Sequence, residues 1–229
     1  MAKNREIVIV GLGETAALAH EYFMHDSDYR VVAFAADDDF IDKEEFRGLP
    51  IIGLSKITNI FPCDKFNLFI AISSGKLNRN RTKLYNRLKN IGYDFVSYVS
   101  SKAFVWHNSI IGENCFILEN NTVQPFVEIG NNVILWSGNH IGHQTVIGDN
   151  CFISSHCVIS GFCKIGENSF IGVNCTIEDN VTIAADNFIG AGAIIQKNTE
   201  PKSLYQMKQT ELSKVNTHRL FRITENAMD

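Results

Sequence analysis

Two histidines stand close together in the stretch LWSGNHIGHQTVIGDN, residues 135–150. His140 and His143 lie on either side of Ile141, in an otherwise apolar run that contains several glycines. An imidazole ionises near neutral pH, so it can transfer protons, bind a metal ion or simply pack against its neighbours. No third ligand stands at a suitable spacing, and we therefore expect no metal site. The choice between catalysis and packing depends on the elements that position the pair.

Aliphatic side chains recur at every sixth position around these histidines. From Val99 to Ile195, every sixth residue is Ile, Val or Leu. Six residues advance about 600° in an α-helix, so such a column would leave any one face, whereas six is a multiple of the strand period. Turn signals such as IGEN and IGNN return every eighteen residues, which indicates three strands per coil. We therefore predict a parallel β-helix over residues 99–200, with this column as its core.

Five of the six cysteines share one phase of this repeat, four residues after a column member. They are Cys115, Cys151, Cys157, Cys163 and Cys175. Most other residues in that phase are small, which predicts an inward slot where cysteine acts as a small hydrophobic residue. The chain contains no CxxC pair, so we favour this structural role over zinc binding or disulfides.

Residues 1–98 have a different pattern, which predicts a small Rossmann-like α/β domain. Three segments are predicted as strands, REIVIVGLG, YRVVAFAADDD and FNLFIAISSG, and a fourth, YDFVSYV, follows the basic helix KLNRNRTKLYNRLKNIG. The glycine loop with Gly11 and Gly13 opens a predicted helix, ETAALAHEYFMH, and suits a bound phosphate. Asp37 and Asp38 follow the second strand, where a carboxylate can accept hydrogen bonds from a ribose or a base. A nucleotide-sugar site is favoured, while an NAD site and a purely structural loop stay open.

Composition and charge limit which partners and which cellular compartment can be expected for the protein. The net charge of −4 gives no electrostatic reason to expect nucleic acid or an anionic membrane as a partner. The apolar run Ile7–Val10 is too short for a signal peptide or a membrane span, so we expect a cytoplasmic protein without membrane insertion. Residues 201–229 are predicted to form a C-terminal cap, with a helical segment, over the open end of the β-helix.

The hexapeptide pattern resembles that of the left-handed β-helix acyltransferases across roughly 100 residues. With the α/β domain, the chain resembles bacterial sugar acyltransferases that include sialic acid O-acetyltransferases, UDP-4-amino-sugar N-acetyltransferases and GDP-perosamine N-acetyltransferase. This resemblance implies a left-handed β-helix, a homotrimer and acetyl-CoA as the acyl donor. It also implies that the first domain binds the nucleotide of a UDP-, dTDP- or GDP-linked amino sugar.

The same resemblance assigns roles to residues of the β-helix. His143, four residues before the Ile147–Gly148 pair, matches the general base of these enzymes. Gln144 occupies the position where the relatives commonly carry an acid. His140 is a neighbour that could orient the substrate or His143, while a solvent-facing position or packing at an interface is the alternative that its place in the repeat favours. Correspondence by coil implies donor contacts at Gly161, Val173 and Ala191, with the Gly161 N–H as an oxyanion donor.

On the acceptor side, Asn78 and Arg81 match positions that the relatives use around the nucleotide phosphates. Glu14 departs from the relatives' glycine loop and would repel a phosphate unless its side chain turns away.

The expected activity is transfer of an acetyl group to the amino group of a nucleotide-linked deoxy-amino sugar, with cell-surface glycan or O-antigen biosynthesis implied by the family alone. Sugar O-acetylation, as on sialic acid, is an alternative with the same fold and base. An inert β-helix scaffold is an alternative of another class, supported by Gln144 and Glu14, and a nicotinamide-binding regulator is a third. The sequence does not identify the sugar or the nucleotide.

Overall fold

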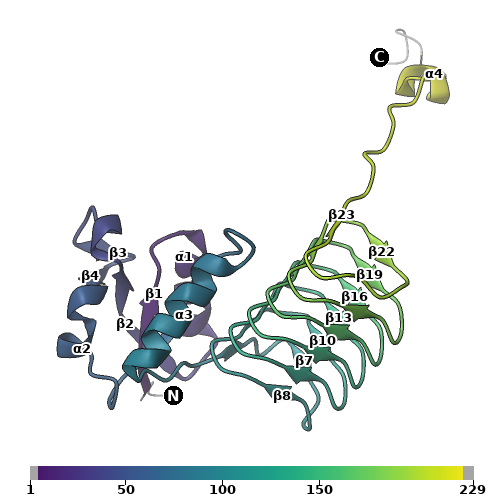
Figure 1. Ribbon diagram of the computed structural model, residues 1–229. Coiled ribbons are helices and arrows are strands. Elements are labelled where there is room, and N and C mark those ends of the chain that lie inside the picture. Colours follow the sequence, from purple (N-terminus) through teal and green to yellow (C-terminus); the bar gives the residue numbers. More distant parts are fainter. Residues whose placement is uncertain (1–4, 224–229) are drawn as a thin grey trace.

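The computed structural model, which describes residues 5–223, consists of an α/β domain beside the first coils of a long β-helix, followed by an extended tail (Figure 1). The α/β domain is built on a five-stranded sheet in the order β3-β4-β2-β1-β5. Its strands are β1 (Arg5–Val10), β2 (Tyr29–Ala36), β3 (Glu45–Phe46), β4 (Leu49–Gly53) and β5 (Asn67–Ile70). All pairings are parallel except that of β3 with β4.

Helices cover both faces of this sheet, because successive residues of a strand point to opposite sides. Ile7 and Ile9 of β1 pack in one core with α1 (Glu14–His25), and Val8 and Val10 pack in another with α3 (Arg79–Ile91). The remaining short helices are η1 (Asp38–Phe40), η2 (Leu54–Lys56) and α2 (Ile57–Ile60). The predicted small α/β domain is therefore confirmed.

The prediction that YDFVSYV forms the last strand of this domain is wrong. Phe95 forms only an isolated parallel bridge with Leu68. The two residues Tyr98–Val99 form β6, which pairs with a strand of the β-helix rather than with β5. The segment therefore connects the two sheets.

The β-helix has three parallel sheets, and paired strands are eighteen residues apart along the chain, as Ile134 and Phe152 are. The exception is the last pair of the first sheet, in which Phe188 and Leu204 are sixteen residues apart. The first sheet contains β6 (Tyr98–Val99), β9 (Phe116–Ile117), β12 (Ile134–Leu135), β15 (Phe152–Ile153), β18 (Phe170–Ile171), β21 (Phe188–Ile189) and β23 (Leu204–Tyr205). The second contains β7 (Phe104–Val105), β10 (Thr122–Val123), β13 (His140–Ile141), β16 (Val158–Ile159), β19 (Thr176–Ile177) and β22 (Ile194–Ile195). The third contains β8 (Ile110–Ile111), β11 (Glu128–Ile129), β14 (Val146–Ile147), β17 (Lys164–Ile165) and β20 (Thr182–Ile183).

The predicted aliphatic column forms the core of this β-helix. Every column member from Ile117 to Ile195 is buried in a single hydrophobic cluster. The five cysteines in the predicted inward slot are buried in the same cluster, between the column residues. Burying one such aliphatic side chain contributes about 1.5–3 kcal/mol, so this column is the main stabilising element of the β-helix.

Turns join the three sheets at three corners, which we name by their contacts. The domain corner, next to the α/β domain, comprises residues 112–115, 130–133, 148–151, 166–169 and 184–187. The Trp136 corner comprises residues 118–121, 136–139, 154–157, 172–175 and 190–193. The His143 corner comprises residues 106–109, 124–127, 142–145, 160–163 and 178–181.

Left-handed backbone conformations at these corners explain the recurring asparagines. Asn114, Asn132 and Asn150 have φ angles of 53°, 57° and 63°, in a region that asparagine tolerates well. Their side chains form a buried ladder, with amide-to-oxygen distances of 2.7 Å and 2.8 Å between successive coils. The eighteen-residue signal therefore reports both a backbone requirement and a hydrogen-bonded stack.

The C-terminal tail differs in part from the predicted cap. β23 pairs with β21 and adds a last strand to the first sheet. Residues 206–223 are all exposed, and the single-turn helix α4 (Thr217–Phe221) stands away from the β-helix (Figure 1). Only β23 and the turn before it lie against the last coil.

Candidate active site

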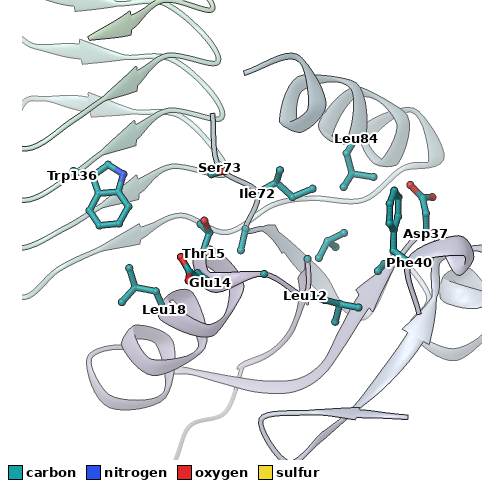
Figure 2. Close-up of a pocket in the computed structure, with 15 residues that line it drawn as sticks. Leu12, Glu14, Thr15, Leu18, Asp37, Phe40, Ile72, Ser73, Leu84 and Trp136 are labelled. Atoms are coloured by element: carbon teal, nitrogen blue, oxygen red, sulfur yellow. The ribbon is translucent and has the colours of Figure 1, made fainter. Parts of the chain in front are cut away.

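A cavity of about 740 Å³ lies in the α/β domain beside Trp136 of the β-helix. Figure 2 shows the residues that line it, with Trp136 facing the start of α1 and with Asp37 and Phe40 at the opposite end. The predicted glycine loop forms part of its wall. Gly11 has a φ of 137°, and a Cβ there would stand 2.6 Å from the Ala71 carbonyl oxygen, so no other residue fits.

Charge in this cavity comes only from carboxylates among the described lining residues, Glu14 and Asp37. Gly13 is the N-cap of α1, so the backbone N–H groups of the first helical turn point toward the cavity. The backbone N–H of Glu14 is one of these groups. Asp37 forms an exposed ion pair with Arg87 at 2.6 Å. An anion bound here would depend on backbone donors rather than on cationic side chains.

Asp38 does not line the cavity, contrary to prediction. Its carboxylate accepts hydrogen bonds from the Ser55 hydroxyl at 2.8 Å and the Ser55 N–H at 3.2 Å. These bonds hold the pKa of Asp38 below its usual value. The side chain is directed toward Gly53 of β4 and Ser55 of η2, away from the residues that line the cavity.

Asn78 and Arg81 likewise serve a different purpose from the predicted phosphate contacts. Both side chains are fully buried where α3 meets the domain corner. Arg81 donates to the carbonyl oxygens of Asn132, Asn150 and Cys151 at 3.2–3.4 Å. Burial lowers the pKa of Arg81 to about 10.

The other donors of these two residues are also engaged with the protein. Arg81 Nη1 contacts the Ile72 and Ser73 carbonyl oxygens at 3.3 Å and 3.2 Å, and Asn78 Nδ2 contacts those of Asn168 and Ser169 at 3.2 Å and 3.3 Å. No donor is left for a phosphate, so the pair fastens the two domains together.

His143 is exposed at the third of the β-helix corners, away from this cavity. Its imidazole lies against the backbone of Gly161 in the next coil, where a Cβ would stand 2.8 Å from Cε1 and 2.9 Å from Nε2. Its backbone N–H donates to the Gln124 side-chain oxygen at 2.9 Å. An exposed imidazole beside a side-chain-free surface is accessible to a reacting group, as a general base must be.

The two other residues of the predicted catalytic group have different surroundings. His140 lies in β13 between Thr122 and Val158 and is half-buried on the outer face of the second sheet. Gln144 is exposed in the left-handed conformation, with a φ of 58°, and its N–H donates to the Pro125 carbonyl oxygen at 3.1 Å. His140 and Gln144 thus occupy the same coil as His143.

The predicted donor contacts lie at two corners of one chain. Gly161 belongs to the His143 corner, while Val173 and Ala191 are exposed one above the other at the Trp136 corner. The Gly161 N–H donates to the Asp179 carboxylate at 2.8 Å. This hydrogen bond argues against the predicted oxyanion role of that N–H in the observed conformation.

Several cavity residues had no signal in the sequence beyond ordinary packing. Leu18 and Leu84 belong to the buried patterns of α1 and α3, and Phe40 follows the acidic run after β2. Trp136, at a corner of the β-helix, also lies in the cavity wall. Periodicity identifies such residues as buried or half-buried but not as neighbours of one cavity.

Two further searches concern residues 5–223. No group of three or more His, Cys, Asp or Glu side chains in this part of the chain is arranged to hold a metal ion. Nor does any helix there combine the length and apolar character that a membrane span requires.

The β-helix matches a known family. Residues 108–143, 126–161 and 162–197 match the bacterial transferase hexapeptide (six repeats) model, which covers most of the β-helix. Among curated protein sequences, none matches the chain.

Solved structures with the same two-part fold extend this match to the α/β domain. PerB from Caulobacter crescentus, in complex with CoA and GDP-perosamine, is 25% identical, with 88% of this chain and 93% of that chain covered and a TM-score of 0.76. The acetyltransferase domain of PglB from Neisseria gonorrhoeae is 22% identical, with 88% and 96% covered and a TM-score of 0.77. WeeI from Acinetobacter baumannii is 20% identical, with 86% and 93% covered and a TM-score of 0.58.

The fold is therefore the predicted one, an α/β domain followed by a left-handed parallel β-helix of hexapeptide repeats. The resemblance to the hexapeptide-repeat sugar acyltransferases is confirmed by the family match together with these structures.

Proposed function

We propose that the protein is an acetyl-CoA-dependent N-acetyltransferase acting on the amino group of a nucleotide-linked deoxy-amino sugar, with His143 as general base. The observation that carries this proposal is the likeness over 88% of the chain to PerB, whose structure holds CoA and GDP-perosamine. In our proposal the cavity at the glycine loop receives the nucleotide. Backbone N–H groups at the start of α1 would bind its phosphates.

The proposed reaction needs one base and no metal. The sugar amine attacks the thioester carbonyl carbon, and His143 accepts a proton from the nitrogen as the new C–N bond forms. The C–S bond then breaks, and coenzyme A leaves as a thiolate that takes up a proton. An imidazole accessible to solvent suits this role, and the Gly161 backbone covers one side of the ring.

A homotrimer is part of this proposal. The cavity lies in the α/β domain beside Trp136, whereas His143 lies at another corner of the β-helix and is absent from the cavity lining. The second and third sheets carry exposed apolar residues on their outer faces, such as Val158 and Ile110. A neighbouring copy packed there would bring its own Trp136 corner, with Val173 and Ala191, toward His143. Such an arrangement would unite the donor contacts that a single chain keeps apart.

The enzyme would act in the cytoplasm, with its product entering cell-surface glycans. The test uses purified protein, acetyl-CoA and a panel of UDP-, dTDP- and GDP-linked 3-amino and 4-amino sugars, with free thiol as the readout. Thiol release with one amino sugar supports the proposal. Release only with hydroxyl acceptors such as sialic acid would replace it with O-acetylation. No release and no coenzyme A binding would favour a scaffold.

A further inference from the structure

Two phenylalanines at the His143 corner occupy a backbone conformation that their side chains disfavour. Phe126 and Phe162 have φ angles of 64° and 57°, and they lie one coil before and one coil after Gln144. The other left-handed corner positions between Asn114 and Lys202 carry Asn, Asp, Gln, His, Lys or Gly. A bulky residue at positive φ is unusual, and Asn would fit with less strain. Stability of the fold therefore does not explain these two residues.

Phe162 has a specific neighbour, the ring of His143. The two ring centroids are 4.9 Å apart, and the rings are nearly perpendicular at 88°. The Phe162 N–H also donates to the His143 carbonyl oxygen at 2.9 Å, which fixes one backbone against the other. No such ring contact with His143 is present for Phe126 within residues 5–223.

Gly161 provides the second contact with the same imidazole. Any side chain at this position would begin 2.8–3.3 Å from three atoms of the ring, so glycine lets the imidazole lie directly on the backbone. The Asp179 carboxylate accepts the Gly161 N–H at 2.8 Å and holds this surface in place from the next coil. The imidazole is therefore bounded by a flat backbone surface and by an aromatic ring.

We propose that Gly161 and Phe162 are positioning residues that hold the His143 imidazole in its reactive orientation. This inference rests on the proposed function, in which His143 is the base. No side-chain hydrogen bond from Gln144 to His143 is present in the described structure, so orientation by a neighbouring acid is replaced by contact with the next coil. The strained backbone at Phe162 is retained because the ring must stand beside the imidazole. A base outside its productive orientation loses much of its effect, since proton transfer needs hydrogen-bond geometry.

The test uses one substitution at Phe162 that should raise the stability of the protein, because it relieves strain, and lower its activity, because it removes the positioning contact. Phe162→Asn relieves the left-handed strain, so the melting temperature rises by about 2–4 °C. It also removes the ring contact, so kcat falls by roughly 10- to 100-fold while KM for acetyl-CoA stays unchanged. Phe162→Tyr keeps the aromatic ring, so its kcat stays close to that of the wild-type protein. Phe126→Asn is the matched control, because it relieves the same strain two coils away and leaves kcat unchanged.

A second readout does not depend on turnover. The ring protons of His143, assigned by their absence from the NMR spectrum of His143→Asn, should be shifted by the nearby Phe162 ring. In Phe162→Asn the chemical shifts of the His143 ring protons should move toward those of a freely exposed histidine. In Gly161→Ala these shifts should also change, because the imidazole is displaced from the backbone. Unchanged shifts would overturn the inference whether or not the wild-type protein transfers acetyl groups.

The two proposals fail in different ways. If the wild-type protein is active and Phe162→Asn retains its full kcat, the positioning role is wrong and the proposed function stands. If the wild-type protein transfers no acetyl group to any acceptor, the proposed function is wrong, and the positioning role in catalysis falls with it. A melting temperature that drops with kcat in Phe162→Asn would mean that Phe162 is a packing residue, and this also contradicts the inference.

Discussion

The guanidinium of Arg81 lies 3.2 Å from the carbonyl oxygen of Asn150, across the boundary between the α/β domain and the β-helix. The two residues are 69 positions apart in the sequence. Arg81 is fully buried and also donates to carbonyl oxygens of its own domain. This one side chain therefore connects the wall of the cavity to the corner of the β-helix.

Replacing Arg81 by Met should lower the free energy of unfolding by at least about 3 kcal/mol, because several buried carbonyl oxygens lose their donor. Arg81→Lys should restore little, since one ammonium group does not reproduce the planar set of donors. Chemical denaturation measures both. Arg79→Met is the control on the same helix, because its ion pair with Asp186 is partly exposed and is worth less than about 1 kcal/mol. Equal losses at the two positions would contradict the anchoring role.

Asp26 should make stability depend on pH below about 4. Partial burial alone would raise the pKa of Asp26, but hydrogen bonds from Ser101, Tyr98 and Ser100 outweigh it and lower the pKa to about 2. The ionised carboxylate is therefore favoured by folding, and its contribution is present above the unfolded pKa of 3.8 and lost as pH falls through 2. We expect Asp26→Asn to cost about 1 kcal/mol at pH 7, a value reduced for solvent screening.

Thermal unfolding from pH 2 to pH 7 tests this dependence. The difference between wild type and Asp26→Asn should shrink as the pH falls, while the exposed neighbour in Asp28→Asn should show almost no difference at any pH. A constant difference across the range would mean that Asp26 acts through packing rather than through its charge.

Glu14 should weaken the binding of a nucleoside diphosphate in the cavity. Its carboxylate sits at the start of α1, where it competes with an anion for the same helix N-terminus. We expect Glu14→Gln to tighten the binding of UDP or GDP by about 2- to 5-fold, equivalent to roughly 0.3–1 kcal/mol. Calorimetric titration measures the change, with Glu21→Gln on the same helix but outside this cavity as the control. Weaker binding by Glu14→Gln would instead show that the carboxylate contacts the ligand.

The β-helix could be predicted from the sequence because its information is local and repeated. Ile141 and Ile159 occupy the same position in successive coils, so the inward-pointing position recurs in every coil. The asparagine turns repeat for an equally local reason, the left-handed backbone of Asn132 and Asn150. No comparison of distant segments was needed to place these residues.

The interface between the domains could not be predicted in this way. Arg81 on a basic amphipathic helix is compatible with a phosphate contact, and only the packing of α3 on the domain corner shows that its donors meet carbonyl oxygens. The partner of Asp38 was not predictable for the same reason, since Ser55 is 17 residues away on another element. The charge of a residue and its position in the sequence do not reveal which groups its side chain contacts in the folded protein.

The candidate site was predictable as a set of residues but not as a geometry. The glycine loop and His143 stood out in the sequence, and the contact between His143 and Phe162 did not, because it joins two coils. The exposed phenylalanine at positive φ was a signal that hexapeptide periodicity alone does not interpret.

The measurement that tests the account most directly is acetyl transfer by His143→Asn beside the wild-type protein, with coenzyme A binding measured on both by calorimetry. Asn keeps a polar side chain of similar reach at this exposed corner but cannot accept the proton from the amine. We predict a loss of about 10²- to 10⁴-fold in kcat, the range that a general base supplies, with coenzyme A binding unchanged. Wild-type turnover in His143→Asn would show that another group is the base and would contradict the account.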